Sequence, residues 1–76
     1  MFNEYKTLEE FLKDVGEGKA RGKRPYYYDG DYYCSVCGEP WDAYGVRIAL
    51  KGKVSDMTPT EAKKFMKGLG CPCCQG

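Results

Sequence analysis

The chain has 76 residues, a formal net charge of +1 and no histidine. A chain of this length forms one domain, here residues 1–76, and below about 80 residues a small core usually needs a staple such as a metal ion. The near-neutral charge excludes a strong global field toward a partner. The missing histidines exclude the usual general base and the usual nitrogen ligand of a metal.

A helix is predicted over about residues 7–16. Thr7 is placed to cap it, Glu10 follows three residues later as in a capping box, and Gly16 is placed to end it. The apolar residues fall on one helix face: Leu8, Phe11, Leu12 and Val15. We expect this face to pack on the metal-binding half of the chain; the alternative is a helix that binds a partner.

A basic loop is predicted over residues 17–25, because glycines interrupt it and little in it can be buried. We expect this loop to be mobile. Its four cations precede a run of three tyrosines: Lys19, Arg21, Lys23, Arg24, then Tyr26, Tyr27 and Tyr28. Basic side chains neutralise phosphates and exposed aromatic rings stack on unpaired bases, so these seven residues are candidate contacts for single-stranded nucleic acid or for a protein partner.

A hairpin followed by a cysteine turn is predicted over residues 26–40. Asp29-Gly30 lies between two aromatic runs, which is a strong hairpin signal. With that turn, Tyr27 opposes Tyr32 and Tyr26 opposes Tyr33. The second strand leads into the first cysteine pair, and residues 39–42 are expected to form a turn, with Trp41 packing over the site.

The remaining elements are a strand region over residues 44–54 and a helix over residues 59–67. Val46, Ile48 and Leu50 alternate with polar or small residues, the pattern of a half-buried strand. The helix has a capping threonine at Thr58, a proline at its first position and Glu61 at the capping-box position. Gly68 is placed to end it, and the second cysteine turn follows over residues 71–76.

The cysteines form two C-x2-C pairs, Cys34 with Cys37 and Cys71 with Cys74. Each pair can direct two sulfurs toward one ion, and four thiolates complete a closed tetrahedral site. Such ligands favour Zn²⁺ or iron, and a closed site is structural rather than catalytic. Cys73 is a surplus thiol that is either a spectator or a replacement for one of its neighbours, although the spacing favours Cys71 with Cys74.

Two other interpretations of the cysteines are weaker. The Cys-Pro-Cys-Cys sequence is typical of a redox dithiol only when it opens a helix after a strand. A disulfide framework is disfavoured by the odd cysteine count and by an N-terminal sequence without a signal peptide, and no apolar run has the length of a transmembrane helix. We therefore expect a reducing, cytoplasmic compartment.

The two cysteine turns resemble the knuckles of rubredoxins and zinc ribbons. Tyr33 before the first pair, Gly38 after it, and Trp41 with Asp42 add to the similarity with rubredoxin. The resemblance covers about a dozen positions and implies one tetrahedral metal held by the two knuckles. The chain departs from rubredoxin at Gln75, where that family has glycine, and in the capped helix between the knuckles.

Together these features predict a small α+β, metal-stabilised domain with zinc-ribbon or rubredoxin-like knuckles, two short helices and a hairpin. We expect no enzymatic activity, because the sequence has no catalytic constellation and suggests no small-molecule substrate. The predicted function is a zinc-binding interaction module for a larger protein or for single-stranded nucleic acid. The alternative is a rubredoxin-type iron electron carrier.

Overall fold

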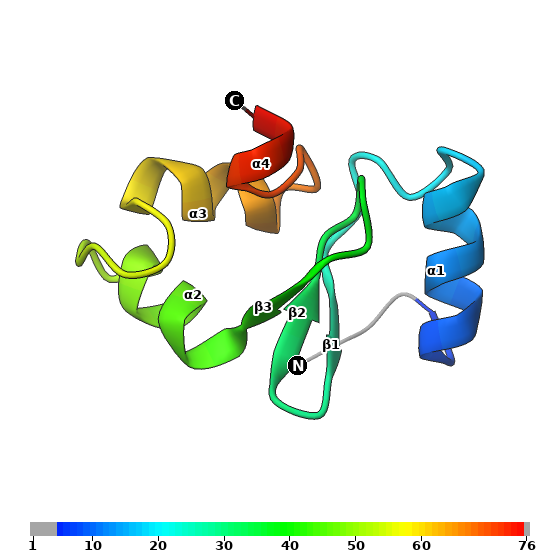
Figure 1. The fold of residues 1–76 in the computed structure, drawn as a ribbon, viewed down its shortest axis with the longest axis horizontal. Helices are drawn as coiled ribbons and strands as arrows, with labels where there is room; N and C mark the ends of the chain where they lie inside the picture. The colour runs from blue at the N-terminus through cyan, green and yellow to red at the C-terminus, as the bar shows by residue number, and fades with distance from the viewer. Residues whose placement is uncertain (1–4, 76) are drawn as a thin grey trace.

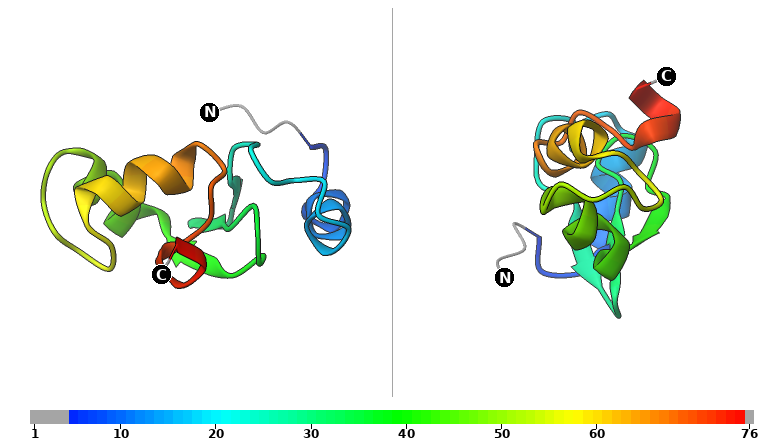
Figure 2. Two further views of the ribbon diagram at one scale, coloured as in Figure 1. Left: turned by 90° about the horizontal axis from the view of Figure 1, so that it is seen from above. Right: turned by 90° about the vertical axis from the view of Figure 1, so that its left-hand side faces the viewer.

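A three-stranded antiparallel sheet lies between helices in the computed structural model, which describes residues 5–75 (Figure 1). One helix lies on one side of the sheet, two lie on the other, and a short last helix closes the chain (Figures 1 and 2). In chain order the elements are α1 (Leu8–Gly16), β1 (Tyr26–Tyr28), β2 (Asp31–Tyr33), β3 (Pro40–Asp42), α2 (Ala43–Leu50), α3 (Pro59–Met66) and α4 (Pro72–Gln75). The α+β class agrees with the sequence. None of the helices within residues 5–75 has the length and apolar character needed to span a bilayer.

The tyrosine hairpin has the predicted register. Tyr26 pairs with Tyr33 and Tyr27 with Tyr32. Asp29 and Gly30 have φ angles of 50° and 85°, the left-handed conformation of both central residues in a type I′ turn. This turn matches the twist of the flanking strands, so the two turn residues fix which tyrosines share a face.

The two faces of the hairpin belong to two separate cores. Tyr26 packs on α1, with its ring centroid 5.6 Å from that of Phe11. Tyr32 lies on the other face, where its ring is 5.4 Å from Tyr27 and 6.5 Å from Phe65. The larger core on this second face contains two of the cysteines: Tyr32, Cys34, Ala43, Val46, Ala49, Met57, Ala62, Phe65 and Cys71. The prediction that α1 packs on the metal-binding half is confirmed in part: Leu12 lies beside Gly38 of the first cysteine turn, but the buried residue of α1, Phe11, belongs to the small second core.

The segment predicted as a turn at residues 39–42 instead contains strand β3. Trp41 pairs with Tyr32 and packs against the larger core, as expected for a packing role. β3 is an edge strand, where the missing N–H of Pro40 is tolerated. The indole Nε1 of Trp41 is buried and has no hydrogen-bond partner among the described residues.

The strand predicted over residues 44–54 is wrong, because this segment begins with helix α2. The Asp42 side chain accepts a hydrogen bond from the Gly45 N–H at 3.3 Å and caps the helix. Ala43, Val46 and Ala49 recur every three residues and are all buried against the larger core. The alternation at Val46, Ile48 and Leu50 was misleading, because capping and small buried side chains outweigh the β propensity of two branched residues.

The other helix boundaries agree closely with the sequence. Thr7 accepts from the Glu10 N–H at 3.2 Å, and Thr58 with Glu61 forms a complete capping box. Gly16 is the last residue of α1, but the chain turns away from the helix axis two residues later, at Gly18 with φ 75°.

The two neighbouring apolar residues of α1 differ in burial and therefore in expected energetic weight. Phe11 is fully buried, whereas Leu12 is 38% exposed. We expect Phe11→Ala to lower the free energy of unfolding by about 3–5 kcal/mol, because it leaves a cavity in the small core. Leu12→Ala should cost clearly less. Urea unfolding of both metal-loaded variants tests this, and equal losses would contradict the assignment of Phe11 to the core.

Candidate metal centre

The first cysteine turn follows directly from β2. The Cys34 N–H donates to the Glu39 carbonyl at 2.9 Å, and the Gly38 N–H donates to the Cys34 carbonyl at 2.9 Å. Gly38 has a φ of 77°, and a Cβ added there would lie 3.1 Å from Leu12 Cδ2. The turn is therefore closed by its own backbone and held against α1.

The second cysteine turn begins after α3 and continues into α4. The Cys74 N–H donates to the Cys71 carbonyl at 2.8 Å, which places both side chains on the same side of one helical turn. Gly70 precedes this turn with a φ of 110°, and a Cβ there would lie 2.7 Å from the Cys74 Cβ and 3.3 Å from Val36 Cγ2. No local pattern in the sequence predicts this close approach of the two knuckles at Gly70.

The two turns bring four sulfur atoms into one cluster. The Sγ atoms of Cys34, Cys37, Cys71 and Cys74 all lie within 4.8 Å of one another. The separations are 3.9 Å for Cys34–Cys74, 3.7 Å for Cys37–Cys71 and 3.6 Å for Cys71–Cys74. A tetrahedron with metal–sulfur distances of about 2.3 Å has sulfurs about 3.8 Å apart. The cluster therefore has the dimensions of a tetrathiolate metal site.

Backbone N–H groups converge on the sulfur of Cys34. Val36 donates at 3.3 Å, Cys37 at 3.5 Å and Cys71 at 3.2 Å. Hydrogen bonds to the charged form stabilise a thiolate. The bond from Cys71 also joins the two turns directly, across a sequence separation of 37 residues.

The thiols influence one another's protonation. Partial desolvation by the surrounding protein raises the pKa of Cys37 and that of Cys74. Burial opposes ionisation at Cys71 as well, but a hydrogen bond from the Cys74 N–H and bonds from neighbouring thiols hold the pKa of Cys71 below its ordinary value. Four packed thiols accommodate several negative charges only beside a cation, so this donor set fits a thiolate-binding metal.

Cys73 lies outside the four-sulfur cluster and is exposed. Its Sγ, the Cys71 Sγ and a Glu39 carboxylate oxygen form a second group of potential ligands within 4.8 Å of one another. The charge of Cys71 raises the pKa of Cys73. This group has only three donors and shares Cys71 with the four-sulfur cluster. The complete tetrahedral set is therefore the four-sulfur cluster, which contains Cys74.

Two polar side chains for which the sequence predicted no structural role support the turns. The Ser35 hydroxyl is buried and donates to the Lys23 carbonyl at 2.6 Å, which ties the basic loop to the first turn. The Gln75 amide donates to the Gly70 carbonyl at 2.8 Å and to the Glu61 carbonyl at 3.2 Å. Gln75, the departure from the rubredoxin pattern, thus fastens α4 to α3.

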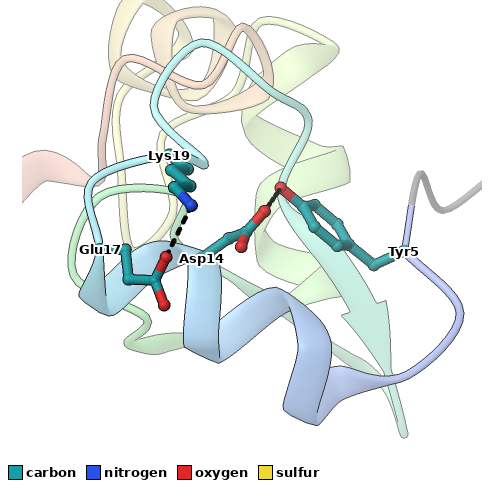
Figure 3. Close-up of polar contacts among 4 residues, drawn as sticks. All are labelled: Tyr5, Asp14, Glu17 and Lys19. Carbon is teal, nitrogen blue, oxygen red and sulfur yellow. Dashed lines mark hydrogen bonds and ion pairs between the residues drawn. The ribbon is translucent and has the colours of Figure 1, made fainter.

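The basic loop is more buried than predicted. Ala20 is fully buried and Pro25 is buried, and the Gly22 N–H donates to the Gly68 carbonyl at 2.8 Å. Lys19 forms an ion pair with Glu17 at 2.9 Å, at the end of the helix where Asp14 accepts from the Tyr5 hydroxyl (Figure 3). The prediction that little of this loop is buried is therefore wrong.

The predicted partner contacts differ in their exposure. Tyr26 is only 7% exposed, so the prediction that it is free to stack on a base is wrong. Tyr27 is half-buried against the larger core, and Tyr28 is 52% exposed. Lys23 lies over the ring of Tyr5, with Nζ 5.1 Å from the centroid. Lys19, Arg21 and Arg24 are exposed, so the loop offers cations without the row of aromatic rings that the sequence suggested.

Comparisons with protein-family models, with curated proteins and with solved structures find no match for this chain. The similarity to zinc-ribbon and rubredoxin knuckles is therefore one of local motif and cluster geometry.

Substitution of single cysteines tests the ligand set. Replacing any member of the four-sulfur cluster by serine should abolish metal binding and cooperative folding, because each supplies one tetrahedral ligand. The matched control is Cys73→Ser, which should keep both. Metal content and circular dichroism measure the outcome. Loss of metal in Cys73→Ser with retention in Cys74→Ser would show that the second turn uses the other sulfur.

The approach of the knuckles at Gly70 gives a second prediction. Gly70→Ala should lower the free energy of unfolding by at least about 2 kcal/mol, because of its positive φ and the contact with Cys74. Gly16→Ala is the control, since nothing lies within 4 Å of its added Cβ. It should be neutral or stabilise by up to about 1 kcal/mol. Similar denaturation midpoints for the two variants would contradict the requirement for glycine at position 70.

Proposed function

We propose that the chain is a non-catalytic interaction module whose fold is held by one structural Zn²⁺ ion on Cys34, Cys37, Cys71 and Cys74. The observation that carries this proposal is the four-sulfur cluster, whose members lie within 4.8 Å of one another at tetrahedral spacing. When bound, such an ion links ligands from distant parts of the chain and supplies folding free energy of order 10 kcal/mol.

The absence of enzymatic activity is part of this proposal. Four protein thiolates saturate a tetrahedral ion, so no position remains for water or substrate. The chain also has no histidine to act as a general base near neutral pH. A reducing, cytoplasmic compartment would keep the thiols available to the metal.

An iron electron carrier is the second candidate. The N–H bonds to the Cys34 sulfur favour it, since hydrogen bonds to ligand sulfurs tune the potential of iron–sulfur centres. Tetrahedral thiolate sites take either metal with similar geometry. Zinc remains the better proposal because the chain departs from rubredoxin at Gln75 and in the helix between the knuckles.

Metal analysis of protein purified without added metal tests the proposal. We expect one zinc per chain, a colourless solution, and unfolding on addition of a strong chelator, because binding and folding are coupled. A red protein with one iron per chain would contradict the zinc proposal and support the iron electron carrier instead. Folded protein without any metal would contradict both the zinc module and the iron electron carrier.

A further inference from the structure

A basic groove lies on the solvent side of α2. It has a volume of about 370 Å³ and is lined by Tyr44, Arg47, Ile48, Lys51 and Lys53. No residue of this groove belongs to the metal cluster or to the basic loop.

The geometry of α2 separates this groove from the core. Successive helical residues are about 100° apart, so Tyr44, Arg47, Ile48 and Lys51 share one face. Ala43, Val46 and Ala49, on the other side, are buried in the larger core. After the helix, Gly52 has a φ of 96° and the Lys53 N–H donates to the Ile48 carbonyl at 3.2 Å. This Schellman-type end brings Lys53 back beside the groove.

The groove combines cations with an open aromatic ring. Its lining contains no acidic residue, and within the described part of the chain Arg47, Lys51 and Lys53 form no ion pair with a carboxylate. Tyr44 is 71% exposed, more than the 52% of Tyr28. The Arg47 guanidinium lies 5.8 Å from the Tyr27 ring centroid, a cation–π contact.

We propose that this groove binds single-stranded nucleic acid, with the Tyr44 ring stacked on an unpaired base and the three cations near the flanking phosphates. Charge complementarity requires an anionic occupant, and a stacked base is worth about 5- to 150-fold in affinity. An acidic peptide would satisfy the cations but leave the Tyr44 ring uncovered. The proposal names the partner of the interaction module proposed above and rests on it, but it does not depend on which metal the module holds.

The test is a fluorescence titration of metal-loaded protein with a labelled oligothymidylate of about 12 nucleotides at several salt concentrations. The groove variant neutralises the three cations: Arg47→Gln, Lys51→Gln and Lys53→Gln. Its matched control removes the same charge from the loop: Lys19→Gln, Arg21→Gln and Arg24→Gln. The groove variant should bind at least about tenfold more weakly at low salt. The steepness of the plot of log K against log salt should decrease by about 2, because each of the three lost phosphate contacts contributes about 0.7. The loop variant should change both values far less.

Three further variants isolate stacking from charge. Tyr44→Ala should weaken binding about 5-fold or more without changing the salt slope, Tyr44→Phe should retain binding, and Tyr28→Ala should behave like the wild type. All of the substituted side chains are exposed, so metal content and circular dichroism should stay unchanged.

Three outcomes would overturn the proposal. Absence of binding at low salt excludes nucleic acid as the partner. Equal losses in the groove and loop variants show diffuse attraction rather than a site on α2. Tighter binding of a labelled polyglutamate peptide than of the oligonucleotide, unaffected by Tyr44→Ala, assigns the groove to an acidic protein. Each can occur with one zinc bound per chain, so failure here is distinguishable from failure of the metal proposal.

Discussion

Two turns that are far apart in the sequence meet at Cys34 and Cys71, where the Cys71 N–H donates to the Cys34 sulfur at 3.2 Å. Both residues are fully buried, and both belong to the larger core with Tyr32 and Phe65. Half of the cysteine cluster is therefore part of the core, and its other two members, Cys37 and Cys74, lie at the surface. Thiolates this close together repel one another unless a cation balances their negative charge. A bound metal ion would therefore stabilise the sheet and the helices together.

The sheet connects the two cysteine turns to the rest of the chain. β2 ends at the first cysteine turn, and its register with β1 directs Tyr32 toward the larger core and Tyr26 toward Phe11. The Ser35 hydroxyl bond to the Lys23 carbonyl then holds the basic loop on the same turn. Helix α1 is connected to the cluster in two ways, through the hairpin at Tyr26 and through Leu12 beside Gly38 of the first cysteine turn.

Local signals in the sequence predicted those features that a few neighbouring residues determine. Asp29-Gly30 indicated the hairpin and its register, Thr58 with Glu61 indicated the start of α3, and the C-x2-C spacing indicated the pairs that meet in space. The errors arose where tertiary contacts decide. Val46 alternates with its neighbours as in a strand, yet it lies on a helix because a cap and a small-residue face fit the core. The contact of Gly70 with Val36 and the burial of Tyr26 depend on segments distant in sequence, so no local pattern marked them.

The central claim is that one metal ion joins the four sulfurs of the cluster. X-ray absorption spectroscopy of the protein as purified, at the edge of the metal that it contains, tests this most directly. The account predicts a zinc edge with four sulfur neighbours at about 2.3 Å and no nitrogen or oxygen in the first shell. A first shell with oxygen or nitrogen ligands, or with fewer than four sulfurs, would contradict it.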